Sequence, residues 1–169
     1  MRLNFAPMKK VQIPSLTEVE QRSPSGKFQS FCKNVSVALG ARPRVNEPGE
    51  AHPFDFQIRR IPPGAAVCPY HSHAAQWELF VIISGQGTVR RNGETHAVEA
   101  GDAFVHPPGT AHQLLNASKT EDLIVHIIAD NPPVDVFHYP DSNKYGTRPL
   151  GKYFRIEEVD YFEGEDRSA

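Results

Sequence analysis

Short segments in which apolar and polar residues alternate dominate the pattern of this chain. Residues 54–59 alternate strictly, and their two phenylalanines and Ile58 share one face of an extended segment. Residues 28–39 and 122–129 are rich in β-branched and aromatic residues, which is typical of further strands. No long segment with helical periodicity interrupts them. The pattern therefore predicts an all-β protein that is built from short strands.

Turn signals fall between these strands. The dipeptide Asn92-Gly93 separates two alternating segments, so residues 88–98 are predicted to form a β-hairpin with a type I′ turn. Residues 107–110 read Pro-Pro-Gly-Thr and suit a type II turn, with the second proline and the glycine at its centre. The Pro- and Gly-rich segment 42–53 predicts a longer loop. Short strands joined by tight turns favour an antiparallel jelly roll.

One predicted strand, residues 76–83, is apolar on both faces. Glu78 shares one face with Phe80 and Ile82. The opposite face is formed by Trp77, Leu79, Val81 and Ile83. A strand that is apolar on both faces is normally covered on both sides. We therefore expect a partner subunit or a terminal arm to cover this strand, and we expect a homodimer.

The length of 169 residues fits one domain with terminal arms. We expect an N-terminal arm over residues 1–26, a barrel domain over 27–130, and a C-terminal extension over 131–169 that packs on the barrel or on a partner subunit. Within this extension, residues 130–149 are expected to be loop. Residues 153–162 are expected to add an edge strand or to contact a neighbouring subunit.

Composition excludes several classes of function. The net charge of −2 gives no basic footprint for nucleic acid, and no apolar segment is long enough to span a membrane. The N-terminal region lacks an apolar signal-peptide core, so a cytoplasmic location is expected. The sequence leaves open whether translation starts at Met1 or at Met8. Cys32 and Cys68 are too few to form a disulfide framework.

Two blocks of closely spaced residues carry the candidate chemistry. His71 and His73 are two residues apart on a predicted strand, 67–73, so their side chains would share one face. Glu78 and His112 come from later segments. Three imidazoles and one carboxylate that converge on one point are typical of a site for a first-row transition metal.

The two blocks resemble the two sequence motifs of the cupin superfamily. The first motif, G-x5-H-x-H-x3,4-E-x6-G, is matched by His71, His73, Glu78 and Gly85. It departs once, because six residues rather than five lie between Gly64 and His71. The second motif, G-x5-P-x-G-x2-H-x3-N, is matched without a gap by Gly101, Pro107, Gly109, His112 and Asn116. Together the motifs cover about a third of the chain.

This resemblance implies a fold and a metal site, but no particular reaction. The implied fold is a double-stranded β-helix, or jelly-roll barrel, here with N- and C-terminal arms. The implied metal ligands are His71, His73, Glu78 and His112. One divalent transition metal is expected, and Fe, Mn, Zn, Ni and Co all remain open. Fe or Mn would suit oxygen chemistry, whereas Zn, Ni or Co would suit Lewis-acid chemistry.

Residues next to the motif positions allow two interpretations each. Tyr70 and Trp77 could line a pocket, but an aromatic residue more often belongs to a core or an interface. Asn116 could reach the site, although structural hydrogen bonding is the simpler interpretation. The role of Gln76 is open.

His106 and His126 could act behind the ligands or as proton shuttles, although a solvated or hydrogen-bonded structural role is favoured for each. Cys68 lies three residues before His71 and should face the opposite way on a regular strand, which makes it a poor ligand. No further Asp or Glu falls at an obviously inward position, so the sequence assigns no general acid or base.

The favoured function is that of a metal-dependent enzyme for a small organic molecule. The resemblance implies an oxygenase, a decarboxylase, or a sugar or sugar-phosphate isomerase. The alternative is a non-catalytic cupin that binds or senses a small molecule. A storage-like or purely structural barrel is disfavoured, because all four ligand positions are intact.

Overall fold

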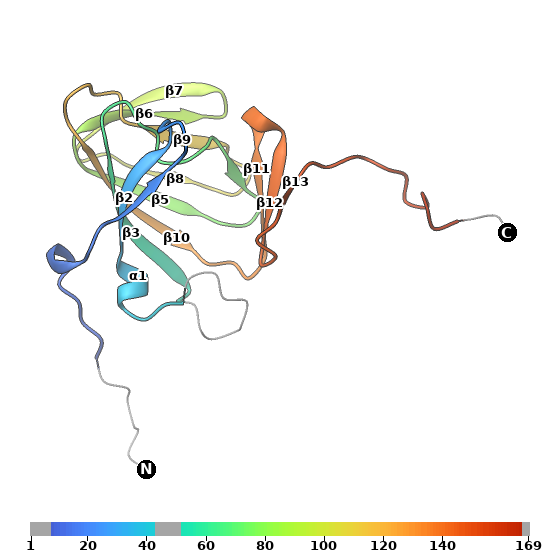
Figure 1. The fold of residues 1–169 in the computed structure, drawn as a ribbon, viewed down its shortest axis with the longest axis horizontal. Coiled ribbons are helices and arrows are strands. Elements are labelled where there is room, and N and C mark those ends of the chain that lie inside the picture. Colours follow the sequence, from blue (N-terminus) through green and yellow to red (C-terminus); the bar gives the residue numbers. More distant parts are fainter. Residues whose placement is uncertain (1–7, 43–51, 167–169) are drawn as a thin grey trace, which may run out of the picture.

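The computed structural model describes residues 8–42 and 52–166. Residues 1–7, most of the loop expected at 42–53, and residues 167–169 lie outside this range. The central strands form a barrel, and the segments at the two ends of the chain extend away from it (Figure 1). Within the described range, no helix has the length and apolar character needed to cross a bilayer.

The secondary structure is almost entirely β. The strands are β1 (Val19–Arg22), β2 (Gln29–Asn34), β3 (Phe54–Ile61), β4 (Ser72–His73), β5 (Glu78–Ser84), β6 (Gln86–Arg91), β7 (Glu94–Glu99), β8 (Ala103–His106), β9 (His112–Leu115), β10 (Leu123–Asp130), β11 (Asp135–Tyr139), β12 (Lys144–Arg148) and β13 (Tyr153–Phe154). The helical segments are α1 (Val35–Ala38) and two 3₁₀ turns, Ile13–Ser15 and Pro140–Ser142.

The strands pair in three antiparallel sheets. A six-stranded sheet has the order β1-β2-β3-β10-β5-β8, and a three-stranded sheet has the order β7-β6-β9. Apolar side chains from both sheets form one core, which consists of Ile61, Ala65, Phe80, Ile82, Val89, Val98, Leu114, Leu123 and Val125. Two sheets that enclose one core in this strand order confirm the predicted jelly roll.

The third sheet corrects an expectation from the sequence. Residues 130–149, expected to be loop, contain β11 and β12, which pair with β4 and β13 in the order β13-β12-β11-β4. Phe137 of β11 lies opposite His73 of β4. The C-terminal hairpin is therefore joined to the barrel at the strand that carries a motif histidine. Of the expected edge strand over 153–162, only β13 forms.

Two other predicted strands are shorter than expected. The strand predicted over residues 28–39 ends at Asn34, whose side-chain oxygen accepts a hydrogen bond from the Val37 backbone N–H at 2.9 Å and so caps α1. The strand predicted over 67–73 is reduced to β4 with isolated bridges at Ala66 and His71. Both predicted turns are confirmed by positive φ angles, at Asn92 and Gly93 in the hairpin and at Gly109 in the second turn.

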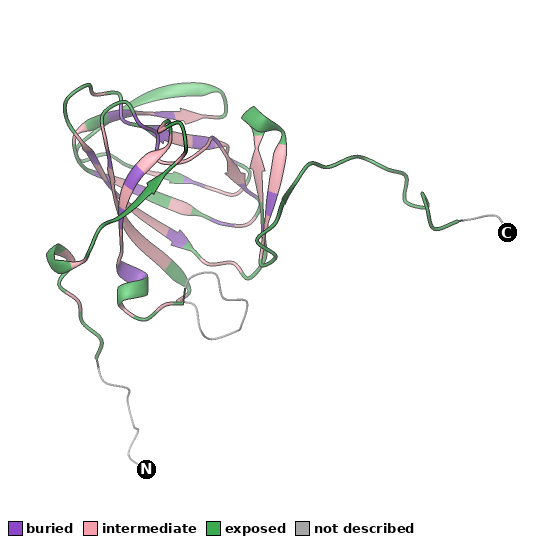
Figure 2. Cartoon of the chain, viewed as in Figure 1, coloured by how far each residue is buried: buried purple, intermediate pink, exposed green. Residues whose placement is uncertain are grey.

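In strand β3 of the six-stranded sheet, the polar face points into the barrel and the apolar face points outward. Asp55, Gln57 and Arg59 line a pocket inside the barrel. They share this face with the apolar inward residues of β10, because Arg59 pairs with Val125 and Gln57 with Ile127. The aromatic residues of β3 and Ile58 lie on the outer face. The colouring by burial shows long half-buried stretches along this sheet (Figure 2).

Asn116 ties two loops to the barrel core. It is fully buried, and its side-chain NH₂ group donates to the backbone carbonyls of Ile61 and Glu121, each at 2.8 Å. Its side-chain oxygen accepts a hydrogen bond from the Ser118 N–H at 2.9 Å. The structural interpretation of Asn116 is therefore confirmed, because all hydrogen bonds of its amide go to backbone.

We expect the substitution Asn116→Ala to lower the free energy of unfolding by about 2–4 kcal/mol, because it leaves backbone groups without partners in a buried place. Urea unfolding at fixed metal content measures this change. The control Gln86→Ala, at an exposed strand position, should change stability by less than about 0.5 kcal/mol. Equal effects of both substitutions would show that Asn116 is not a structural anchor.

Candidate metal centre

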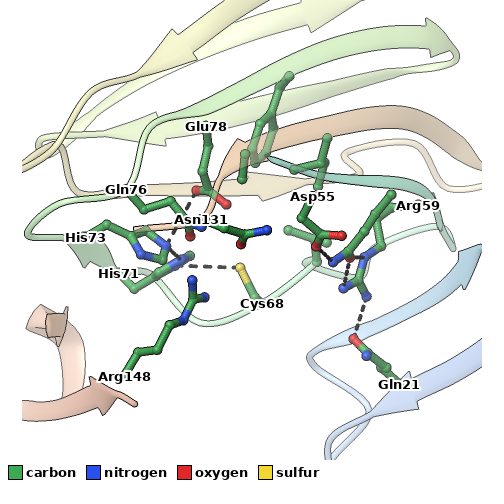
Figure 3. A pocket seen from close by; sticks show the side chains of 15 residues that line it. Gln21, Asp55, Arg59, Cys68, His71, His73, Gln76, Glu78, Asn131 and Arg148 are labelled. Carbon is green, nitrogen blue, oxygen red and sulfur yellow. Dashed lines mark hydrogen bonds and ion pairs between the residues drawn. The ribbon is translucent and has the colours of Figure 1, made fainter. Parts of the chain in front are cut away.

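Four side chains from separate segments meet at one end of the barrel. His73 lies on β4, Glu78 begins β5 and His112 begins β9, while His71 forms an isolated bridge with His112. The donor atoms of His71, His73 and Glu78 lie within 4.8 Å of one another. The Nε2 atom of His112 lies 2.7 Å from Glu78 Oε2. Figure 3 shows His71, His73 and Glu78 grouped on one side of the pocket.

The Nδ1 atom of each of the three imidazoles faces an oxygen acceptor of the protein. His71 Nδ1 donates to the Pro69 carbonyl at 2.9 Å, and His112 Nδ1 donates to the Thr110 carbonyl at 3.0 Å. His73 Nδ1 lies 2.6 Å from Asp135 Oδ2. A carbonyl oxygen and an ionised carboxylate can only accept a hydrogen bond, so the proton lies on Nδ1 in these rings. The Nε2 atoms are therefore left to face the common point.

This arrangement requires positive charge between the rings. The Nε2 atoms of His71 and His73 are 3.1 Å apart, and two lone pairs at that distance repel each other. Glu78 Oε2 and His112 Nε2 are buried, and they have no hydrogen-bond partner among the described residues besides each other. Protons or a metal ion can supply the missing charge. Nitrogen and carboxylate donors suit a divalent transition metal, so the residues fit such an ion.

The charge state of Glu78 agrees with such a site. Burial by itself would raise the pKa of its carboxyl group, but the contact with His112 and the nearby His73 and His71 together lower the pKa to about 2. Glu78 is therefore an anion that faces cationic or metal-binding partners.

Asp135 is a site residue that the sequence did not reveal. It is 1% exposed, and besides the contact with His73 its Oδ1 accepts a hydrogen bond from the Ala75 N–H at 2.9 Å. Burial would raise the pKa of Asp135, but the hydrogen bonds from His73 and Ala75 lower it below its usual range. The carboxylate thus fixes the His73 ring. The sequence indicated no further inward Asp or Glu, and this expectation is wrong. Asp135 was missed because it lies in the segment that was predicted to be loop.

Cys68 is also placed differently from the expectation. It lines the pocket, and its sulfur lies 3.7 Å from His71 Nδ1 rather than on the opposite side. Residues 67–71 do not form a regular strand, so the alternation rule does not apply to them. Burial raises the pKa of the Cys68 thiol to about 12, which keeps it protonated and a weak ligand at neutral pH.

His106 packs directly behind the candidate ligands. Its ring is stacked on that of His112, with centroids 3.9 Å apart and an interplanar angle of 4°. It is 2% exposed, and neither ring nitrogen has a hydrogen-bond partner within the described part of the chain. Burial lowers the pKa of His106 to about 3, so the ring is neutral. The expected hydrogen-bonded role is therefore wrong, and His106 acts through packing.

Of the other neighbours of the motifs, Tyr70, Trp77 and His126 lie outside the pocket, whereas Gln76 lines it. The Tyr70 hydroxyl accepts a hydrogen bond from the Gly93 N–H at 3.1 Å, and the Arg90 guanidinium covers its buried ring. Trp77 is exposed, and His126 lies on the outer face of β10 against the Phe56 ring. Gln76, whose role was open, lines the pocket and donates to the Asp130 carbonyl.

The pocket beside the four side chains has a volume of about 300 Å³, which is enough for a small organic molecule. Its metal-facing wall carries His71, His73 and Glu78, and its far wall carries Asp55, Gln57 and Arg59. In Figure 3, Asp55 and Arg59 lie across the pocket from the three candidate ligands, with Cys68 and Asn131 between the two groups.

The sequence profile described as "Cupin domain" matches residues 57–128, which include all four candidate ligands and both motifs. Residues 57–128 are therefore identified as cupin-domain sequence.

Similar proteins fall into several functional groups. Auxin-binding protein T85 of Nicotiana tabacum is 31% identical over 98 residues, which are 52% of this chain and 51% of that protein. The oxalate-binding protein of Thermotoga maritima is 30% identical over 66 residues, which are 39% and 54% of the two chains. The chain thus spans about half the length of the curated relatives it matches.

The structural similarity extends beyond the cupin domain. A crystal structure of a putative sugar phosphate isomerase from Acidithiobacillus ferrooxidans superimposes with a TM-score of 0.72. The match covers 93% of this chain and 92% of that chain at 21% sequence identity. It therefore extends to strands outside residues 57–128, and at this identity it describes a shared fold.

Proposed function

We propose that this cupin is a metal-dependent enzyme that acts on a small organic molecule. The proposed ligands of one divalent transition metal are His71, His73, Glu78 and His112. The observation that carries the proposal is that all three imidazoles commit Nδ1 to protein acceptors, so that Nε2 of each faces the Glu78 carboxylate. Such an ion would supply Lewis-acid or oxygen chemistry at the pocket.

The pocket also offers a group for proton transfer. Glu78 and Asp135 are occupied by the imidazoles, whereas Asp55 is half-buried in the pocket wall and accepts a hydrogen bond from the Gln57 side-chain NH₂ group. A carboxylate across the pocket from a metal site can act as general acid or base on the far end of a bound molecule. Asp55 therefore favours an enzyme over the alternative, a non-catalytic binding or sensing cupin.

Three reaction types remain open for this site: oxygenase, decarboxylase, and sugar or sugar-phosphate isomerase. A screen of metal-loaded protein with hydroxy acids, dicarboxylic acids and sugar phosphates separates them. Oxygen uptake identifies the first type, CO₂ release the second, and deuterium incorporation from D₂O without net oxidation the third. Saturable binding without turnover would instead support the alternative function. That the protein binds neither nucleic acid nor a membrane stays a prediction from the sequence. The cytoplasmic location also stays a prediction.

The metal proposal predicts about one equivalent of Fe, Mn, Zn, Ni or Co in protein purified without added metal, as measured by elemental analysis. The substitution His73→Ala should lower this content sharply while far-UV circular dichroism stays unchanged. The control His96→Ala removes an imidazole that is half exposed on β7 and should retain full metal content. Full occupancy in the His73→Ala protein would contradict the ligand assignment.

The contact between Asp135 and His73 predicts a second effect. The substitution Asp135→Asn keeps an oxygen that can accept from His73 Nδ1 but removes the charge, so we expect metal affinity to fall about 10- to 100-fold. Competition with a chromophoric chelator measures this affinity. Asp141→Asn, at an exposed position paired with Arg90, serves as the control. Unchanged affinity in the Asp135→Asn protein would show that the carboxylate does not support the site.

We also propose that the chain forms a homodimer through the outer face of the six-stranded sheet. Leu79 is 38% and Ile83 46% exposed there, and Val105 pairs with Leu79 on the same face. The cross-strand neighbours Ile128 and Phe56 extend this apolar surface over β10 and β3. An exposed apolar surface of this extent is typical of a protein interface.

We expect the wild-type protein to sediment as a dimer and the Leu79→Glu protein as a monomer, because a charge at the centre of an apolar interface is strongly unfavourable. Val134→Glu places the same charge at an exposed loop position and should leave the dimer intact. Sedimentation velocity measures both. A wild-type monomer over the full range of concentrations would contradict the interface.

A further inference from the structure

Two arginines line the same pocket as the candidate metal ligands. Arg59 comes from the polar inner face of β3, and Arg148 comes from the end of β12. Both are half-buried. A guanidinium is always charged at physiological pH, so the pocket carries two fixed positive charges in addition to any metal ion.

Arg59 is held in place by neutral groups. Its Nε–H donates to Gln57 Oε1 at 2.9 Å, and its Nη1 donates to Ser30 Oγ at 3.1 Å and to the side-chain oxygen of Gln21. Asp55 does not pair with Arg59, since Asp55 Oδ2 accepts a hydrogen bond from the Gln57 side-chain amide. These contacts use most of the Arg59 donors, which makes it part of the pocket wall.

The guanidinium of Arg148, in contrast, makes no hydrogen bond or ion pair with any residue in the described part of the chain. It lies against the Phe137 ring, whose centroid is 5.8 Å from the guanidinium carbon. Arg148 interacts electrostatically with Asp135, its cross-strand neighbour, but the hydrogen bonds of that carboxylate are with His73 and Ala75. None of the five N–H donors of the Arg148 guanidinium thus has a partner among residues 8–42 and 52–166, and the side chain is partly desolvated.

The strand register places Arg148 beside the metal-facing wall. Arg148 lies opposite Asp135, and two residues further along β11 Phe137 lies opposite His73. In Figure 3 the Arg148 side chain rises from the C-terminal hairpin and its guanidinium points into the pocket, below His71 and Cys68. A ligand that reaches the candidate metal site would therefore pass close to a guanidinium that has no hydrogen-bond partner among the described residues.

We propose that Arg148 binds an anionic group of the substrate, and that the ligand class is a small organic acid or phosphate ester. One end of such a ligand offers a metal-binding oxygen, and the other end carries a carboxylate or phosphate that accepts two hydrogen bonds from the Arg148 fork. The inference rests on the proposed metal-dependent function and narrows its substrates. The pocket volume of about 300 Å³ limits the ligand to a few carbon atoms plus the anionic group.

The test compares ligands that share one metal-binding end. Lactate offers an α-hydroxycarboxylate alone, malate adds a second carboxylate, and 3-phosphoglycerate adds a phosphate. Calorimetric titration of metal-loaded protein should show malate, 3-phosphoglycerate or both binding at least 10-fold tighter than lactate. The ligand with the larger advantage shows whether the carboxylate or the phosphate is preferred.

In the Arg148→Gln protein this advantage should fall below about 3-fold, while metal content and lactate affinity stay within about 3-fold of wild type. Arg148→Lys retains the charge without the fork and should retain an intermediate advantage; it also serves as the test if the glutamine variant does not fold. Arg155→Gln removes the same charge from the exposed C-terminal segment and should retain the full advantage.

The outcomes distinguish this inference from the function on which it rests. Metal-loaded protein that binds malate and 3-phosphoglycerate no better than lactate overturns the role of Arg148 and leaves the metal site intact. The role of Arg148 is also overturned if the Arg148→Gln and Arg148→Lys proteins both retain the full binding advantage of malate or 3-phosphoglycerate over lactate. Protein that takes up no metal, even after reconstitution, overturns the proposed function and this inference with it.

Discussion

Three imidazoles and a carboxylate inside an apolar barrel are stable only if each polar atom has a partner, and this constraint organises the end of the barrel. The backbone supplies two of the partners, the carbonyls of Pro69 and Thr110. The third comes from Asp135, so the C-terminal hairpin must dock on β4 before His73 is fully satisfied. The remaining nitrogen of each ring faces the others, where only positive charge can relieve the repulsion.

The motifs were the part of the molecule that the sequence predicted best. Their spacing identified the four side chains that meet, because His-x-His on a strand and a histidine after a tight turn are local features. The hairpin at Asn92 and the turn at Gly109 were predictable for the same reason, since positive φ angles demand particular residues.

Errors arose where long-range packing overrides local pattern. The alternation in β3 was visible, but an alternating strand does not state which face points inward, and here the polar face with Asp55 and Arg59 lines the pocket. The short strands β11 and β12 carry no strong periodic signal, so Asp135 and Arg148 were missed with them. Cys68 was misplaced because Pro69 and its neighbours leave the regular strand geometry on which the alternation rule depends.

The pocket is assembled from parts of the chain that lie far apart in sequence. The motif segments supply the metal-facing wall, while Gln21 of β1 and Arg148 of β12 come from the N- and C-terminal flanks. Substitutions in these flanking strands can alter which molecule is recognised and leave the ligand spacing untouched. Two chains with identical motif residues can therefore differ in chemistry, and comparison of such chains should begin at their terminal strands.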